Sequence, residues 1–341
     1  MKTAVVLFNL GGPDSPKAVG PFLFNLFNDK AIINVPQPIR TFIARWLSSK
    51  RKATAKEIYE QMGGHSPILQ LTEEQAHALD QKLNLRGEYK TFIAMRYWKP
   101  FTKKTVKEVK DYAPDKVVLL PLYPQYSTTT TASSFAEWYK EAKRQKLFVR
   151  HHPVCCYPFD NHFIDAHVET IKPVYLEVAK YGPPRILFSA HGLPEKIIKK
   201  GDPYQWQVER TVSAIMRKLG SLDHAICYQS KVGPLTWIGP SIEEEIHRAG
   251  QDGVSLVVVP IAFVSEHSET LVELDIEYRG LARKSGVPHY ARAPALGTHP
   301  EFIDSLAWLV EATGLYPNCS NALGRQCPKV MKQCGFKEWK A

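Results

Sequence analysis

Short apolar runs separated by longer amphipathic segments form the main pattern of the chain. The clearest runs are residues 3–9, 90–97, 116–122, 185–190, 224–229 and 254–263, and weaker ones are 147–154 and 287–293. Strands that are apolar throughout and alternate with helical segments are typical of parallel sheets covered on both faces. The pattern therefore predicts an α/β protein with two doubly wound domains of about four strands each.

The proline-rich segment at residues 181–185 opens the second half of the pattern and suggests where the two domains meet. We expect a first domain over residues 1–150, which includes an apolar segment at about 21–56. A second domain is expected over 151–318, followed by a cysteine-containing extension over 319–341.

The segment from Lys30 to Lys56 carries seven cationic residues and no acidic one. Its apolar residues follow helical spacing: Ile39, Phe42, Ile43, Trp46 and Leu47. Nucleic acid would explain the cations but not the apolar stripe, so we expect no nucleic-acid partner. A membrane surface or a large apolar anion would explain both features, and a stripe that is simply core is the plainer alternative.

Composition narrows the class further. The chain has 341 residues, is 44% hydrophobic and 23% charged, and carries a formal net charge of +10. It contains no apolar run long enough to span a membrane and no pattern of a signal peptide. Six cysteines without a secretory signal do not indicate a disulfide framework. The cytoplasm is the expected location.

Residues 263–278, FVSEHSETLVELDIEY, place Glu269, Glu273 and Glu277 four residues apart. On an α-helix these carboxylates would share one side, with Leu271, Leu274 and Tyr278 on the other. Like charges at this spacing destabilise a helix by roughly 0.2–0.5 kcal/mol per pair, so helix stability alone does not favour them. A solvated acidic face and a path for cations or protons are the two interpretations.

Ligands bind beyond the carboxyl ends of the strands in open parallel sheets. His191 follows the run at 185–190 and suits proton transfer near neutral pH, although a single histidine is often structural. Glu266 and His267 follow the run at 254–263 and, with Glu269, suit transient contact with a divalent cation. Flat apolar walls there are expected from the aromatic residues Tyr97, Trp98, Tyr123, Tyr126, Trp237 and Phe263, for which ordinary core is the alternative. Arg51 and Arg96 could meet carboxylates of a ligand.

Cys319, Cys327 and Cys334 lie near the end of the chain without any C-x-x-C pair. They form either a thiolate metal or iron–sulfur site or three free thiols. Cys155 and Cys156 could contribute a fourth ligand only if the fold brings them close.

At the level of motifs the chain resembles the ferrochelatases of the bacterial type. The matching stretches run in order over nearly the whole chain: NLGGP (9–13), EQMGGHSPI (60–68), MRYW (95–98), LYPQYS (122–127), SAHGLP (189–194), GDPY (201–204), QSKVGPLTWIGP (229–240) and VPIAFVSEHSETLVELDIEY (259–278). The resemblance implies two flavodoxin-like (chelatase-like) domains with a cleft between them, and insertion of Fe²⁺ into protoporphyrin IX to form protohaem.

The resemblance also implies roles for individual residues. His191 and Glu269 are expected to be catalytic. A metal path is expected from His191, Glu269, Glu273, Glu277, Glu266 and His267. Porphyrin contacts are expected from Leu10, Arg51, Tyr59, Arg96, Tyr97, Tyr123, Ser230, Trp237 and Phe263. The apolar lip corresponds to residues 21–47, which would contact the inner face of the cytoplasmic membrane.

Two departures concern a [2Fe-2S] cluster, which animal members hold. Their internal cysteine position is Thr128 here, and the terminal cysteines have a different spacing. Cys319, Cys327 and Cys334 remain candidate ligands. The alternatives for the reaction are a chelatase acting on coproporphyrin or sirohydrochlorin and a carrier without catalysis. The apolar lip argues against the carboxylate-rich sirohydrochlorin.

Overall fold

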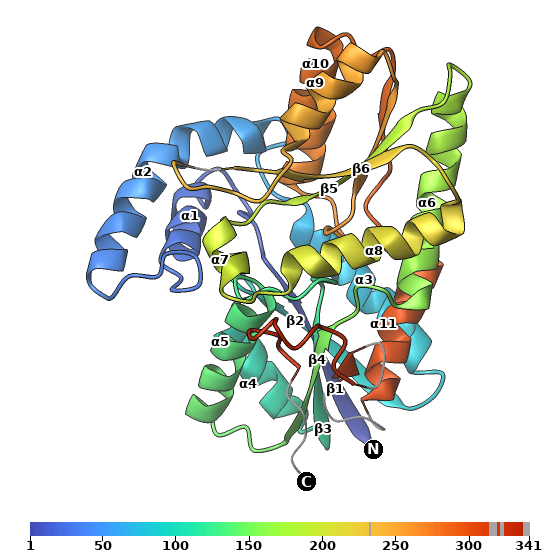
Figure 1. The fold of residues 1–341 in the computed structure, drawn as a ribbon. Coiled ribbons are helices and arrows are strands. Elements are labelled where there is room, and N and C mark those ends of the chain that lie inside the picture. Colours follow the sequence, from blue (N-terminus) through green and yellow to red (C-terminus); the bar gives the residue numbers. More distant parts are fainter. Residues whose placement is uncertain (232, 314–318, 321–323, 337–341) are drawn as a thin grey trace.

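The computed structural model describes residues 1–231, 233–313, 319–320 (backbone only) and 324–336. Two parallel sheets form its framework (Figure 1). The first sheet has the order β2-β1-β3-β4-β9. Its strands are β1 (Lys2–Asn9), β2 (Glu88–Met95), β3 (Lys116–Pro121), β4 (Arg150–Cys156) and β9 (Cys319–Ser320). The predicted runs at 3–9, 90–97, 116–122 and 147–154 therefore became neighbouring strands.

The second sheet has the order β6-β5-β7-β8 and is also parallel. Its strands are β5 (Arg185–His191), β6 (His224–Gln229), β7 (Leu256–Pro260) and β8 (Tyr290–Arg292). These observations confirm the predicted α/β class with two doubly wound parallel sheets. The two-residue strand β9 extends the first sheet beyond the four strands that the sequence predicted.

Helices cover both faces of the first sheet. Alternate residues of β1 point to opposite sides: Val5 and Leu7 share a core with α3 (Ile68–Leu83), and Ala4 and Val6 share one with α4 (Thr102–Tyr112) and α5 (Thr131–Arg144). This alternation follows from the two-residue period of a strand. An uninterrupted apolar run is thus explained by burial on two faces.

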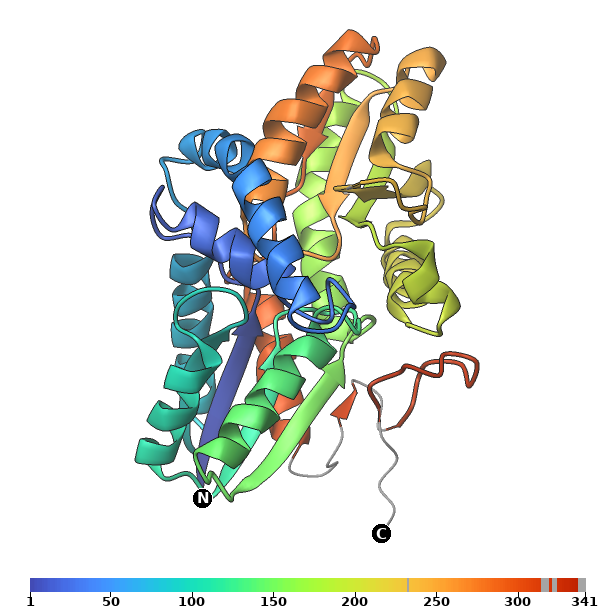
Figure 2. The same ribbon diagram turned by 90° about the vertical axis from the view of Figure 1, so that its left-hand side faces the viewer.

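The second sheet is layered in the same way. α9 (Ile242–Asp252), α10 (Arg279–Lys284) and helix η1 (Glu269–Tyr278) cover one face, and α6 (Asn161–Ala179) and α8 (Tyr204–Leu219) cover the other. The short helix α7 (Glu195–Lys199) follows β5. α11 (Pro300–Ala312) returns to pack against α3 and α6 (Figure 1). In the turned view of Figure 2 the first sheet lies below the second. One apolar core therefore continues from the first sheet to the second.

Buried hydrogen bonds also join the two halves. The side-chain amide of Gln75 in α3 donates to the carbonyls of Val264 and Gly297, and Ser265 donates to the Gln75 side-chain oxygen at 3.1 Å. These groups would be costly to leave unpaired in the core. The division of the chain into domains at residues 150 and 318 stays a prediction.

α1 (Val19–Phe27) and α2 (Ile39–Glu60) form a projecting helix pair beside the sheets (Figure 1). Most of the predicted apolar stripe of α2 does not enter the core: Ile39, Phe42 and Trp46 are 55%, 69% and 62% exposed. The interpretation of the stripe as core is therefore wrong for these three residues. In the part of the chain that the structure describes, no helix is long and apolar enough to cross a membrane.

Candidate active site

The central pair of the site is His191, the last residue of β5, and Glu269, the first residue of η1. Nδ1 of His191 lies 2.8 Å from Oε2 of Glu269, and 38% of the histidine side chain is exposed. The two residues lie far apart in the sequence, so their spacing does not predict this contact. Both residues were nevertheless predicted at the carboxyl edge of the same sheet. The structure brings them together there.

The pair is electrostatically coupled. Burial alone would lower the pKa of His191, but the charge and hydrogen bond of Glu269 outweigh it and raise the pKa. Burial would raise the pKa of Glu269, but the charge and hydrogen bond of His191 hold it below its usual range. An imidazole held in this way has Nε2 left to take a proton from a ligand.

Glu273 follows Glu269 in η1, and its carboxylate accepts four hydrogen bonds. Its Oε2 accepts from the Ser230 hydroxyl at 2.7 Å and the Gln229 amide at 3.1 Å, and its Oε1 accepts from the Ser230 backbone and the Tyr278 hydroxyl, both at 3.1 Å. Burial and the nearby charge of Glu269 raise the pKa of Glu273. A carboxyl group with a raised pKa takes up a proton more readily near neutral pH.

Ser230 directly follows β6 and sits between the two carboxylates. Its hydroxyl lies 3.3 Å from Oε2 of Glu269 and 2.7 Å from Oε2 of Glu273. The backbone of Ser230 has φ = 64°, a left-handed conformation that is uncommon for serine. Strained backbone of this kind is often found at functional sites. Ser230 was predicted only as a porphyrin contact.

Helix η1 is a π-helix, in which the chain winds more loosely than the predicted α-helix. The expectation that Tyr278 would lie on the side opposite the glutamates is therefore wrong, because its hydroxyl bonds to Glu273 five residues earlier. Glu277 is exposed, and the α-helical period that placed it in line with Glu269 and Glu273 does not apply.

Two other predicted metal-path residues have different surroundings. Oε1 of Glu266 accepts from Arg292 and from the backbone of Ala295, both at 2.9 Å, so its charge is balanced locally. His267 is buried, its ring lies edge-on to Phe263, and burial lowers its pKa. Within the described ranges, no group of three or more His, Cys, Asp or Glu side chains is arranged to hold a metal ion.

The predicted wall residues come from both sheets. Leu10, Tyr97 and Tyr123 follow β1, β2 and β3, and Trp237 and Phe263 follow β6 and β7. Trp237 lies close to Gly192, the residue after His191: a Cβ at Gly192 would meet Trp237 Cε3 at 3.3 Å and the Gln229 carbonyl at 3.0 Å. Glycine at this position lets the indole lie close to the backbone beside His191.

Arg96 does not extend freely toward a ligand. Its guanidinium donates to Oδ2 of Asp29 at 2.8 Å and to the Ser133 hydroxyl at 2.8 Å. The same Asp29 oxygen accepts from the hydroxyls of Tyr97 at 2.8 Å and Ser133 at 2.5 Å. Asp29 lies just after α1, and its hydrogen bonds therefore connect the lip to the wall residue Tyr97. The hydrophobic pattern gave no signal for this contact.

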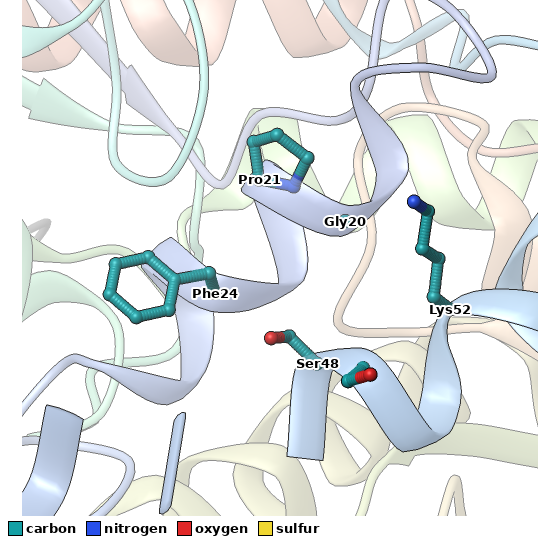
Figure 3. A pocket seen from close by; sticks show the side chains of 6 residues that line it. Gly20, Pro21, Phe24, Ser48 and Lys52 are labelled. Atoms are coloured by element: carbon teal, nitrogen blue, oxygen red, sulfur yellow. The ribbon is translucent and has the colours of Figure 1, made fainter. Parts of the chain in front are cut away.

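The lip helix reaches the catalytic pair at its far end. Tyr59 in α2 is buried, which raises its pKa to about 12, and it is close to Ser268 and Glu269. Arg51, which precedes Tyr59 in α2, is exposed. An open hollow of about 450 Å³ lies between parts of α1 and α2, with Pro21 and Phe24 on one side and Ser48 and Lys52 on the other (Figure 3). Its lining residues belong to α1 and α2 and include neither His191 nor Glu269.

Comparison with known proteins decides the family. The family model described as Ferrochelatase matches residues 2–313. The chain belongs to the ferrochelatase family. It is 55% identical over 311 residues to the ferrochelatase of Wolbachia sp. subsp. Drosophila simulans (strain wRi), covering 90% of this chain and 98% of that one.

Other ferrochelatases match over the full length. The ferrochelatase of Pelagibacter ubique is 48% identical, covering 98% of both chains, and that of Caulobacter vibrioides is 51% identical, covering 99% of this chain and 98% of the relative. The chain is therefore an enzyme of the metal chelatase type, a lyase, and the recognition from its motifs is confirmed.

Solved structures support the fold at lower sequence identity. A sirohydrochlorin chelatase, SirB from Bacillus subtilis subspecies spizizenii in complex with cobalt, aligns with a TM-score of 0.55 at 14% identity, covering 93% of this chain and 97% of that one. SirB from Bacillus subtilis with Fe³⁺ aligns with a TM-score of 0.52 at 16% identity, covering 92% and 96%. At these identities the likeness concerns the fold alone, which is that of two chelatase-like domains.

Proposed function

We propose that the protein inserts Fe²⁺ into protoporphyrin IX to form protohaem, the terminal step of haem biosynthesis, and releases two protons. The contact between His191 and Glu269 is the observation that carries the proposal. It supplies a proton acceptor and a nearby carboxylate at the edge where aromatic residues of both sheets gather. The family membership gives the reaction class.

Chelation must remove two pyrrole protons while the metal exchanges water for ring nitrogens. His191 accepts these protons at Nε2, because its Nδ1 is engaged by Glu269. Glu269 stabilises the imidazolium that forms and fixes the direction of the ring. Tyr97, Tyr123, Trp237 and Phe263 are proposed to form the flat walls that orient the macrocycle.

An anoxic assay with Fe²⁺ tests the reaction and its substrate. The purified protein should convert protoporphyrin IX to protohaem with a higher kcat/KM than it converts coproporphyrin III, because the lip exposes the apolar side chains of Ile39, Phe42 and Trp46. A preference for coproporphyrin III would show that the proposed substrate is wrong and that the proposed chelatase activity is right. Absence of iron insertion into either porphyrin, with intact porphyrin binding, would favour a carrier.

The exposed face of α2 supports a second part of the proposal, peripheral attachment to the cytoplasmic membrane through residues 21–47. Phe42 and Trp46 project apolar rings next to cations, and Lys50 lies 5.3 Å from the Trp46 ring. Such a surface suits an anionic bilayer. The location proposed is therefore the cytoplasm, at the inner face of that membrane.

Vesicle sedimentation tests the attachment. The protein should bind vesicles with anionic lipid more tightly than zwitterionic ones, and the double variant Phe42→Ser, Trp46→Ser should lose this binding. Phe148→Ser is the matched control, because Phe148 is 85% exposed but lies outside the lip. Equal loss in both variants would contradict the role of α2.

Four cysteines support a [2Fe-2S] cluster as a further part of the proposal. Cys155 and Cys156 end β4, and Cys327 and Cys334 lie in the segment 324–336. The Gln207 amide donates to sulfur atoms of Cys156 at 3.3 Å and Cys327 at 3.1 Å. Cys334 lies close enough to Cys155 and Cys327, and Cys155 close enough to Cys156, for these thiols to shift one another's pKa.

Such a cluster takes four thiolates shared between two irons, and these four cysteines supply that number. Their side chains would have to rearrange to hold it, because no three of the described cysteines are arranged to bind a metal ion. When bound, a cluster would join the C-terminal segment to β4 through iron–sulfur bonds. The side chain of Cys319, also a candidate from the sequence, lies outside the described residues. The four cysteines therefore include Cys155 and Cys156 as candidates for the ligand position that the sequence left unassigned.

Iron, sulfide and visible absorption of the purified protein test the cluster. We expect about two irons and two sulfides per chain, and their loss in Cys327→Ser. Cys227→Ser should keep them, because Cys227 is buried in β6 with its thiol near the Phe188 carbonyl. A colourless wild-type protein prepared without oxygen would contradict the proposal.

A further inference from the structure

Strand β8 contacts the middle of helix η1 through the side chains of its first and last residues. The Tyr290 hydroxyl donates to the Leu274 carbonyl at 2.8 Å. The Arg292 guanidinium donates to both carboxylate oxygens of Asp275, from Nε to Oδ1 at 2.9 Å and from Nη2 to Oδ2 at 2.7 Å. These contacts connect η1 to a strand at the edge of the second sheet.

Arg292 also contacts the segment that leads into η1. Its Nη1 donates to Oε1 of Glu266 at 2.9 Å. Glu266 lies three residues before Glu269, and Asp275 lies six residues after it. One guanidinium thus binds the chain both before and after the residue that meets His191.

The chemistry of arginine suits this arrangement. A guanidinium presents its donors in a rigid planar fork, so it can bond both oxygens of one carboxylate and still donate to a second carboxylate. The Arg292 side chain is only 9% exposed, so solvent screens these interactions weakly. A lysine would keep the charge but not the paired hydrogen bonds. Arg292 therefore supplies a defined geometry in addition to charge.

The position of η1 decides whether Glu269 meets His191. His191 ends β5 and Glu269 begins η1, so their 2.8 Å contact joins two separate elements. π-helices are rare and occur mostly as short stretches, whereas η1 has ten residues. Contacts from neighbouring elements are therefore expected to stabilise its winding and its distance from the sheet.

We propose that Arg292 is a positioning residue for iron insertion, which holds η1 against β8 so that Glu269 stays within hydrogen-bond distance of His191. The proposal rests on the chelatase function above. Asp275 and Glu266 are the two anchor points of Arg292 on the chain.

Arg292 acts through η1 rather than on the porphyrin. Among the described residues, its side chain donates hydrogen bonds to Asp275, to Glu266 and to the Ala293 carbonyl. Its replacement should therefore change the rate of iron insertion and leave porphyrin binding as it is.

Arg185 provides a matched control in the same sheet. Its guanidinium also bonds two carboxylates, those of Asp223 and Asp252, each at 2.9 Å, and its side chain is also 9% exposed. Arg185 is the first residue of β5 and His191 is the last, which places them about 20 Å apart along the strand. Arg185 thus contacts the end of α9 and the residue before β6, at the edge of the sheet opposite the site.

Full-length Arg292→Lys and Arg185→Lys are compared with wild type in steady-state iron insertion without oxygen and in hydrogen–deuterium exchange. Each protein is assayed well below the midpoint of its thermal unfolding. We expect kcat to fall on the order of tenfold in Arg292→Lys, with an unchanged KM for protoporphyrin IX, because a displaced catalytic group slows the reaction without removing substrate contacts. Amide exchange over residues 266–278 should become faster in this variant. Arg185→Lys should match wild type in kcat and in exchange over these residues.

Asp275→Asn removes the charge of one anchor point and keeps one oxygen that can accept from Arg292. Its loss in kcat should be smaller than that of Arg292→Lys and of the same kind, with faster exchange over residues 266–278. If Arg292→Lys does not fold, Asp275→Asn makes the same comparison with wild type and Arg185→Lys.

A kcat of Arg292→Lys within about twofold of wild type would overturn the proposal. Equal losses of kcat in Arg292→Lys and Arg185→Lys would also overturn it, because they indicate a general loss of stability. So would slow insertion with unchanged exchange over residues 266–278. If the wild type inserts no iron, the proposed function fails, and exchange alone then tests the contact: faster exchange in Arg292→Lys supports the hold on η1, and equal exchange overturns it.

Discussion

Replacing Asp29 should separate the lip from the porphyrin wall. One oxygen of this buried carboxylate accepts hydrogen bonds from Arg96, Tyr97 and Ser133. Asp29→Ala leaves the guanidinium of Arg96, only 18% exposed, without its anion. Breaking a buried ion pair by removing one partner costs about 3–5 kcal/mol. Arg96 keeps its bond to Ser133, so we expect the lower end of this range, about 3 kcal/mol.

Urea denaturation of Asp29→Ala, Asp29→Asn and wild type measures this loss. Asparagine retains an oxygen that can accept from Tyr97 and Ser133, so its loss in the free energy of unfolding should be smaller, roughly 1–2 kcal/mol. Asp14→Ala is the control, because Asp14 forms an exposed pair with Lys99 at 3.8 Å, which is worth less than about 1 kcal/mol. A loss below about 1 kcal/mol in Asp29→Ala would refute the reasoning.

Two further predictions concern the catalytic pair and the wall beside it. Glu269→Gln keeps a hydrogen-bond partner for His191 but removes the charge that raises the pKa of His191. Only the neutral imidazole accepts protons, so activity is lost as the pH falls through the pKa of His191. The acidic limb of the kcat profile should therefore move to lower pH in this variant. An unchanged acidic limb would contradict the coupling. Gly192→Ala places a Cβ 3.0 Å from the Gln229 carbonyl and 3.3 Å from Trp237, so we expect a stability loss of about 1–3 kcal/mol and weaker porphyrin binding by fluorescence titration. Binding as tight as in wild type would show that Trp237 does not need this close approach.

The strands could be predicted because burial on both faces leaves a direct mark on the sequence. The runs at 116–122 and 185–190 correspond to β3 (Lys116–Pro121) and β5 (Arg185–His191). The rule that ligands bind at the carboxyl edge then placed His191 and Glu269 in one region. The sequence predicted only that the two residues lie in the same region of the fold. The structure adds the contact between Nδ1 of His191 and Oε2 of Glu269 at 2.8 Å.

Features that depend on three-dimensional contacts could not be predicted in the same way. The π-helical winding of η1 leaves no clear period in ten residues, so the α-helical expectation put Tyr278 on the wrong side. The pairing of Arg96 with Asp29 joins positions 67 residues apart. The exposed stripe of α2 has the same pattern as a buried one, and only the structure distinguishes them.

The central claim is that His191 accepts the pyrrole protons during iron insertion. Single-turnover formation of protohaem from Fe²⁺ and protoporphyrin IX, compared between wild type and His191→Ala under anoxic conditions, tests it most directly. The account predicts that the variant folds, binds protoporphyrin IX with wild-type affinity and forms no measurable protohaem. Protohaem formation by this variant at close to the wild-type rate would contradict the claim.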